Sequence, residues 1–123
     1  MRQKKRGYDR TRRVADLLQK TLAQMLLQDM SDDRFRLVTV TGVTVSRDLS
    51  YAKIHISMLF DDAEKIKQVV DALNRAAKSL RYQLAKEVEL RIVPELKFLY
   101  DESTAHGFRI SDLIDEAIKK EKE

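Results

Sequence analysis

Alternation of apolar and polar side chains over residues 51–60 constrains the fold more than any other feature of this sequence. The apolar positions are Ala52, Ile54, Ile56, Met58 and Phe60. A period of two is typical of a β-strand with one buried face. A polar turn over residues 47–50 precedes this run, and the valine-rich segment 38–45 precedes the turn. The sequence therefore predicts a β-hairpin.

A third strand is indicated by the only proline of the chain. Pro94 stands just before a second β-type run, residues 96–100. Because proline has no N–H to donate to a β-ladder, it is found at the start of a strand or on an edge. We therefore expect the strand to begin directly after Pro94.

Apolar residues at helical spacing predict three helices around these strands. The first stripe spans residues 14–26 and belongs to a helix that should end near Met30. The second stripe spans residues 66–84 and follows the aspartates 61–62, which offer an N-cap. A short last helix over residues 110–118 completes the predicted order α-β-β-α-β-α, an α+β fold.

Length and composition indicate one domain of 123 residues. We expect the domain over residues 14–118, a basic arm over residues 1–13 and a flexible tail over residues 119–123. The chain has no cysteine, which excludes disulfides and thiolate metal sites. No apolar run approaches the roughly 18 residues that a membrane span requires. These features predict a soluble cytoplasmic protein with no membrane partner.

Positive charge is concentrated at the N-terminus. Residues 1–13 carry seven lysines and arginines against one aspartate, a net charge of +6, whereas the remaining residues sum to about −2. Such an arm is typical of proteins that contact phosphate and release counterions. The alternative is a tail that only serves solubility. If the arm binds RNA, the candidate contacts include Arg6, Arg10, Arg12 and Arg13.

The predicted long helix carries a second cationic stripe on the face away from its apolar residues. Arg75, Lys78, Tyr82 and Lys86 project within about 80° of one another on a helical wheel. Lysine and arginine bind phosphates and tyrosine stacks on bases, so this face suits RNA. A solvated helix face is the alternative, since Asp71, Glu87 and Glu89 lie nearby.

No arrangement of residues indicates catalysis or a metal site. The two histidines, His55 and His106, lack the spacing of a zinc motif. The paired aspartates at 32–33 and 61–62 are explained by turns and helix caps. We therefore expect no enzymatic activity and no cofactor.

Three segments together resemble the bacterial ribosome-binding factor A family. They are residues 12–15, which read RRVA and are expected to open the first helix, residues 40–53, which include VTGV and VSRDLSYAK, and residues 90–101, which include LRIVPEL and FLYD. The resemblance extends from about Arg6 to about Ile118.

The resemblance implies a type II KH-like fold, in which a long kinked helix crosses a three-stranded sheet. It also implies a non-catalytic factor that binds the immature 30S ribosomal subunit and its 16S rRNA. The family's role is late maturation and 5′-end processing of 16S rRNA, including growth after cold shock, and a ribosome-associated GTPase releases it. A sheet covered by helices needs no partner copy, so a monomer is expected.

The family's kink motif is Ala-x-Gly, which falls here on Ala76, Ala77 and Lys78, with lysine in place of glycine. Lysine favours an unbroken helix. A shallower kink, a bend assisted by Ser79, and a charge that replaces close backbone approach are all compatible with the sequence. The RNA-binding residues expected outside the arm are Arg47, Arg75, Ala76, Ala77, Lys78, Arg81 and Lys86.

Two other functions are compatible with the sequence. One is a protein-interaction adaptor whose arm serves only solubility. The other is a general binder of single-stranded RNA.

Overall fold

The computed structural model describes residues 2–29, 31–59 and 62–102, with side chains from residue 10 onward. Three strands, β1 (Val38–Val45), β2 (Tyr51–Met58) and β3 (Glu95–Tyr100), form one sheet in the order β1-β2-β3. β1 and β2 are antiparallel, and β2 and β3 are parallel. The predicted hairpin is confirmed, and so is the third strand that starts directly after Pro94, which is buried.

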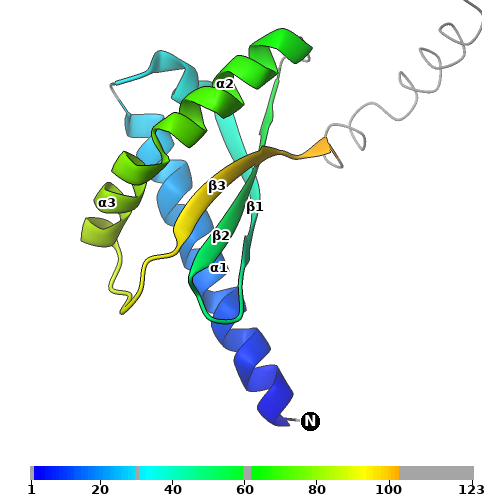
Figure 1. Cartoon of the computed structure of the whole chain (residues 1–123), viewed down its shortest axis with the longest axis vertical. Coiled ribbons are helices and arrows are strands. Elements are labelled where there is room, and N and C mark those ends of the chain that lie inside the picture. The colour runs from blue at the N-terminus through cyan, green and yellow to red at the C-terminus, as the bar shows by residue number, and fades with distance from the viewer. Residues whose placement is uncertain (1, 30, 60–61, 103–123) are drawn as a thin grey trace, which may run out of the picture.

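The helices that accompany the sheet in the described residues are α1 (Arg2–Gln28), the 3-10 helix η1 (Asp33–Leu37), α2 (Ala63–Arg75) and α3 (Ala77–Glu87), as drawn in Figure 1. The elements α2 and α3 correspond to the predicted long helix. They form the crossover that parallel strands require between β2 and β3. The α+β class is confirmed, and the expected last helix over residues 110–118 and the tail over 119–123 lie outside the described residues.

One prediction about α1 is wrong. The helix was expected to open at Arg12, but it begins at Arg2, so the basic arm forms its first turns. Figure 1 shows these turns extending past the sheet. The apolar stripe starts at Val14 because the helix packs against the core from this residue onward. The turns before it are rich in lysine and arginine, which favour a helix without tertiary packing. The stripe marked the packing contact and not the start of the helix.

One face of the sheet is buried against the helices. Its strand residues in the core include Val38, Val40, Ala52, Ile54, Ile56, Leu96 and Phe98, and they join one cluster with Leu18 and Leu22 of α1 and with Leu73, Leu80 and Leu84 of the long helix pair. The predicted alternation in β2 is therefore confirmed, although Ser57 on the other face is also buried. A bulge between Val40 and Gly42 keeps Val43 and Val45 on the core side.

The other face of the sheet carries the alternating polar residues, and we call it the open face. It comprises Thr39 and Thr44 of β1, Tyr51, Lys53, His55 and Ser57 of β2, and Glu95, Lys97 and Leu99 of β3. Most of these side chains are exposed, with His55 and Leu99 half-buried.

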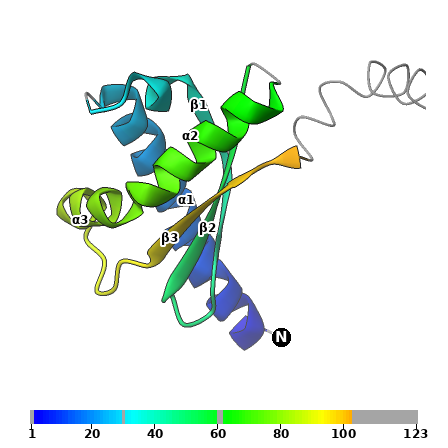
Figure 2. The ribbon, with the colours of Figure 1, turned by 45° about the horizontal axis from the view of Figure 1, so that its top comes forward.

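The long helix is interrupted at Ala76, between α2 and α3. Figure 2 shows the change of direction from one helix to the other. Ala76 has φ −86° and ψ 0°, in the sparsely populated bridge region of backbone conformations. A negative φ is open to any residue, so the bend at Ala76 does not require glycine. The chain can therefore bend here although lysine, at position 78, replaces the glycine of the family's motif. The bend separates two helices that the sequence presents as one apolar stripe.

Hydrogen bonds to β3 and to the segment before it hold the two helices on either side of the bend. The Asn74 side-chain amide donates to the Phe98 carbonyl at 3.0 Å, and the Phe98 N–H donates to the Asn74 carbonyl oxygen at 2.8 Å. On α3, Nε and an Nη of Arg81 donate to the Val93 carbonyl at 3.0 and 2.8 Å. These tertiary hydrogen bonds stabilise the bend, which in the family's motif contains a glycine.

Candidate nucleic-acid interface

The bend lies beside the start of β3 and lines an open cavity of about 220 Å³. Its walls are Ala77, Lys78 and Arg81 of α3 together with Tyr51, Glu95 and Leu96 of the sheet. Lys78 is exposed and Tyr51 is 38% exposed. The cavity therefore places a cation near an aromatic ring, the pair of groups that binds a phosphate and an unpaired base.

Arg81, which the sequence predicted as an RNA contact, holds the loop before β3 by hydrogen bonds. Its side chain is half-buried, and the Nε and Nη groups that donate to the Val93 carbonyl are committed to the loop before β3. A guanidinium has five N–H donors, so Arg81 retains donors for a ligand. Lys78 has no such bond and is the more available cation of the two.

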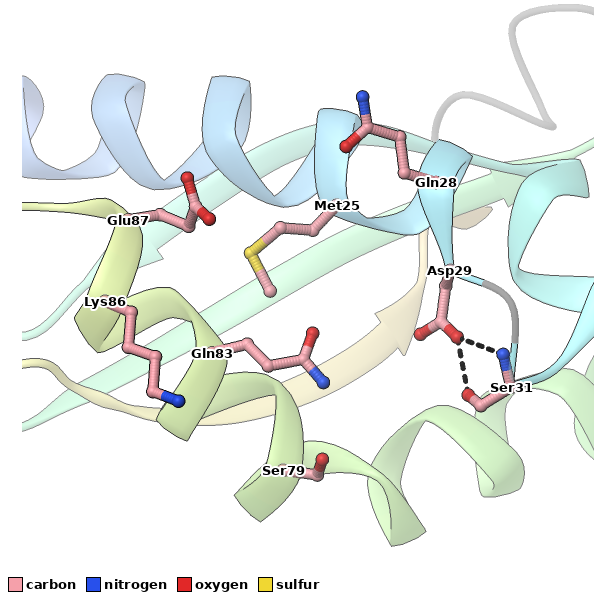
Figure 3. A pocket seen from close by; sticks show the side chains of 8 residues that line it. All are labelled: Met25, Gln28, Asp29, Ser31, Ser79, Gln83, Lys86 and Glu87. Carbon is pink, nitrogen blue, oxygen red and sulfur yellow. Dashed lines mark hydrogen bonds between the residues drawn. The ribbon is translucent and has the colours of Figure 1, made fainter.

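Lys86 and Ser79 line a different cavity, of about 470 Å³, between α3 and the end of α1. Figure 3 shows Ser79, Gln83 and Lys86 on one side and Met25 and Asp29 on the other. The Lys86 Nζ lies 4.5 Å from the centre of the Tyr82 ring, a cation–π contact on the surface of α3. Ser79 is exposed at this cavity, so the bend is explained by Ala76 and its flanking hydrogen bonds and not by Ser79.

The predicted cationic stripe is divided by the bend. Lys78, Tyr82 and Lys86 are all exposed on α3, whereas Arg75 is the last residue of α2. Arg75 is exposed as well, and its charge adds to the lowering of the pKa of Asp32, which is due first to the hydrogen bond from the Arg34 side chain. The structure thus places three of the four stripe residues on α3 and the fourth, Arg75, on α2 across the bend.

The arm residues lie on the first half of α1, which reaches the end of β1 at Thr11 and Arg12. Arg10, Arg12 and Arg13 are exposed, and Arg6 belongs to the same helix. Arg12 lines an open cavity of about 410 Å³ whose other walls include Asp16, Thr44 and Val45. The arm and the bend are therefore separate surfaces on opposite edges of the sheet, β1 on one side and β3 on the other.

Arg47 is presented by the hairpin turn, which Asp48 organises. The Asp48 carboxylate accepts bonds from the Ser46 hydroxyl at 2.7 Å, from the Ser50 hydroxyl at 2.7 Å and from the Ser50 N–H at 3.1 Å. Hydrogen bonds from Ser46 and then Ser50 lower the pKa of Asp48 to about 2. Leu49 has a positive φ of 61°, so the turn imposes backbone strain on a non-glycine residue.

The cations of the predicted interface are not neutralised by carboxylates. Within residues 10–29, 31–59 and 62–102, the side-chain ion pairs are Arg34 with Asp32 and Arg36 with Asp33, both at η1. The exposed cations of the arm, the turn and α3 therefore remain available to an anionic partner.

One aspartate of each pair caps a helix, as the sequence indicated, and Asp61 lies outside the described residues. Asp32 caps η1 by accepting from the Arg34 N–H at 2.9 Å, and Asp62 caps α2 by accepting from Glu64 and Lys65. Among the described residues, no group of three or more His, Cys, Asp or Glu side chains could hold a metal ion. None of the helices in the described part of the chain is long and apolar enough to span a membrane.

Comparison with known proteins gives a consistent result. A family model described as ribosome-binding factor A matches residues 10–114. Ribosome-binding factor A of Shewanella frigidimarina is 46% identical over 115 residues, covering 94% of this chain and 80% of that protein. The protein of the same name from Pseudomonas fluorescens is 48% identical over 115 residues, covering 93% and 86%.

Solved structures agree with the sequence comparison. The crystal structure of ribosome-binding factor A from Thermus thermophilus is 29% identical, with a TM-score of 0.62, and the match covers 73% of this chain and 94% of that one. A homology model of the Thermus thermophilus factor, fitted into a cryo-EM map of a 30S–RbfA complex, is 30% identical, with a TM-score of 0.57, covering 70% and 89%.

Proposed function

Because the chain belongs to the ribosome-binding factor A family, we propose that it is a non-catalytic assembly factor that binds the immature 30S subunit through its 16S rRNA. The observation that carries this proposal is the bend at Ala76, which presents an unpaired Lys78 beside Tyr51. The 30S complex of the Thermus relative supports the choice of subunit. The exposed arginines of α1 provide a second cationic surface for the same partner.

Co-sedimentation with 30S, 50S and 70S particles at low and moderate salt tests this proposal. We expect the protein to migrate with free 30S subunits and not with 50S, and to dissociate steeply as salt rises, because phosphate contacts release counterions. Equal binding to both subunits, or none to 30S, would contradict it. Binding that is insensitive to salt favours the adaptor function, and stronger binding to free RNA than to 30S favours a general single-strand binder.

The biological role that we propose is late maturation of the subunit and processing of the 5′ end of 16S rRNA, with the greatest need in the cold. A strain that lacks the protein should accumulate 30S particles with an extended 5′ end, visible by primer extension after growth at low temperature. A normal 5′ end under these conditions argues against the role.

We further propose that the protein acts in the cytoplasm as a monomer and that a ribosome-associated GTPase releases it from the subunit. Adding such a GTPase with GTP to the purified complex should move the protein to the unbound fraction. Retention on 30S in the presence of GTP would contradict the release step.

A further inference from the structure

The open face of the sheet holds cations that neither the bend nor the arm includes. Lys53 of β2 and Lys97 of β3 are partners in the parallel register, and both are exposed. Thr44 lies opposite Lys53 on the other neighbouring strand, and its hydroxyl is 3.3 Å from Nε2 of His55. Cations therefore occupy adjacent positions on two strands, flanked by a hydroxyl and an imidazole.

This pair of lysines is unfavourable for folding. Like charges side by side on one sheet face repel each other. No carboxylate in the described ranges forms an ion pair with either lysine, since both ion pairs found there belong to η1. Glu95, the acidic residue of β3, is paired in register with Tyr51. An external anion would relieve the repulsion, whereas the sparse apolar surface of this face offers little to an apolar partner.

The position of the lysine pair connects the two surfaces described above. Tyr51 lines the cavity at the bend and precedes Lys53 on the same face of β2 by two residues, a distance of about 7 Å. On the other side, Thr44 lines the cavity that contains Arg12 of the arm. A path from the bend to the arm therefore crosses Lys53 and Lys97.

We propose that one single-stranded RNA segment crosses the open face between the bend and the arm, with its phosphates on Lys53 and Lys97. A single strand fits because the exposed Tyr51 ring can stack on an unpaired base at one end of the path. The inference rests on the proposed RNA binding and adds the route of the RNA. It makes the sheet a contact surface and not only a support for the helices.

The first test is the double variant Lys53→Gln/Lys97→Gln, measured by filter binding to purified immature 30S subunits between 50 and 200 mM salt. The slope of log affinity against log salt should decrease in magnitude by about 1.4, since each phosphate contact to a single strand contributes about 0.7. Affinity at the lowest salt should fall by about an order of magnitude. The melting temperature should stay the same or rise, because the variant removes the repulsion between the two lysines.

The matched control is Lys65→Gln/Lys67→Gln, which removes the same charge from exposed positions of α2. It should leave the slope nearly unchanged. If parent and open-face variant bind with equal slopes, or if the control loses as much as the variant, the route over the open face is wrong. If the parent itself does not bind 30S, the proposed function fails instead, so the two failures can be told apart.

A second test distinguishes RNA from protein as the occupant of this face. Because the chain has no cysteine, Thr39→Cys provides a single attachment point for a photo-crosslinker on the open face. Irradiation of the 30S complex should crosslink this position to rRNA, and Gln68→Cys on the exposed surface of α2 serves as control. Crosslinks from Thr39→Cys only to ribosomal proteins, or at the level of the control, would overturn the proposal.

Discussion

The bend between α2 and α3 and the first half of α1 both present cations to solvent, but the fold holds them in different ways. At the bend, Asn74 and Arg81 join the helices to β3 and to the loop before it. The first turns of α1 extend past the sheet (Figure 1), and the side chains of Arg10 and Arg13 are exposed. The geometry of the bend therefore depends on tertiary contacts, whereas the arm depends mainly on local helix formation.

This difference predicts that stability and RNA binding are linked at the bend and independent on the arm. A variant that loosens the bend should lower both quantities, because Lys78 is positioned by α3. A variant that removes arm charges should lower binding alone, since exposed charges contribute little to folding.

The largest effect is expected from Asn74→Ala. The substitution leaves the backbone N–H and carbonyl of Phe98, a fully buried residue, without their side-chain partners. Each unsatisfied buried group costs about 1 to 3 kcal/mol, so the free energy of unfolding should fall by about 2 to 4 kcal/mol in urea denaturation. Gln68→Ala, at an exposed position of the same helix, is the control and should change it by less than about 0.5 kcal/mol. Equal stability of the two variants would mean that the Asn74 bonds do not hold the bend.

The second largest effect is expected from removing the charges of the arm, which should weaken 30S binding without changing the stability of the fold. Arg10→Gln/Arg12→Gln/Arg13→Gln keeps good helix formers on α1 while removing three exposed charges. The salt slope of 30S binding should decrease by about two to three units, since each phosphate contact contributes about 0.7 to 0.9. The melting temperature should be nearly the same as that of the parent. A lower melting temperature with an unchanged slope would assign the arm a role in folding and none in RNA binding.

The sequence predicted the elements whose cause is local. Alternation identified β2, Pro94 identified the start of β3, and the family motif located the bend near Ala76. The apolar periodicity did not reveal the start of α1, because the solvent-exposed turns of a helix need no apolar stripe. The apolar periodicity of residues 66–84 also continued across the bend without a visible interruption.

The parts of the site that could not be predicted depend on contacts between distant segments. Asn74 binds a residue 24 positions away, and a single asparagine in a helix gives no signal of such a bond. Tyr51 and Lys53 were placed on one strand face by the alternation, but their neighbours Glu95 and Lys97 follow only from the parallel register. The separation of Lys78 from Lys86 into two cavities likewise requires the packing of α1 against α3.

A smaller effect, on affinity, tests whether Lys78 contacts phosphate. Lys78→Ala removes the charge and keeps helix propensity, so it should weaken 30S binding by about 1 kcal/mol, roughly fivefold, without changing the melting temperature. Lys78→Gly restores the family's kink residue and should lower stability by up to about 1 kcal/mol. If backbone approach contributes to binding, the glycine variant should bind better than the alanine variant. Parent-like binding by both would place the contact surface on the arm and the open face.

The smallest effect is expected at the hairpin turn, which is exposed like the arm but held by hydrogen bonds like the bend. The bonds from Ser46 and Ser50 lower the pKa of Asp48 from 3.8 to about 2, so the folded state favours the charged carboxylate. Such a group stabilises the fold above its unfolded pKa of about 3.9, and the contribution is lost as the pH falls toward 2. The melting temperature of Asp48→Asn should therefore lie slightly below that of the parent at pH 7.

The difference between parent and Asp48→Asn should shrink between about pH 4 and pH 2, measured by thermal denaturation at both ends of this interval. Other carboxylates titrate in both proteins and cancel in the comparison, and Asp71→Asn, which removes an exposed charge on α2, controls for net charge. A difference that stays constant down to pH 2 would show that the Asp48 bonds do not depend on its charge. In that case the turn that presents Arg47 is held by its backbone bonds, among them the Ser46 N–H to the Tyr51 carbonyl at 2.9 Å.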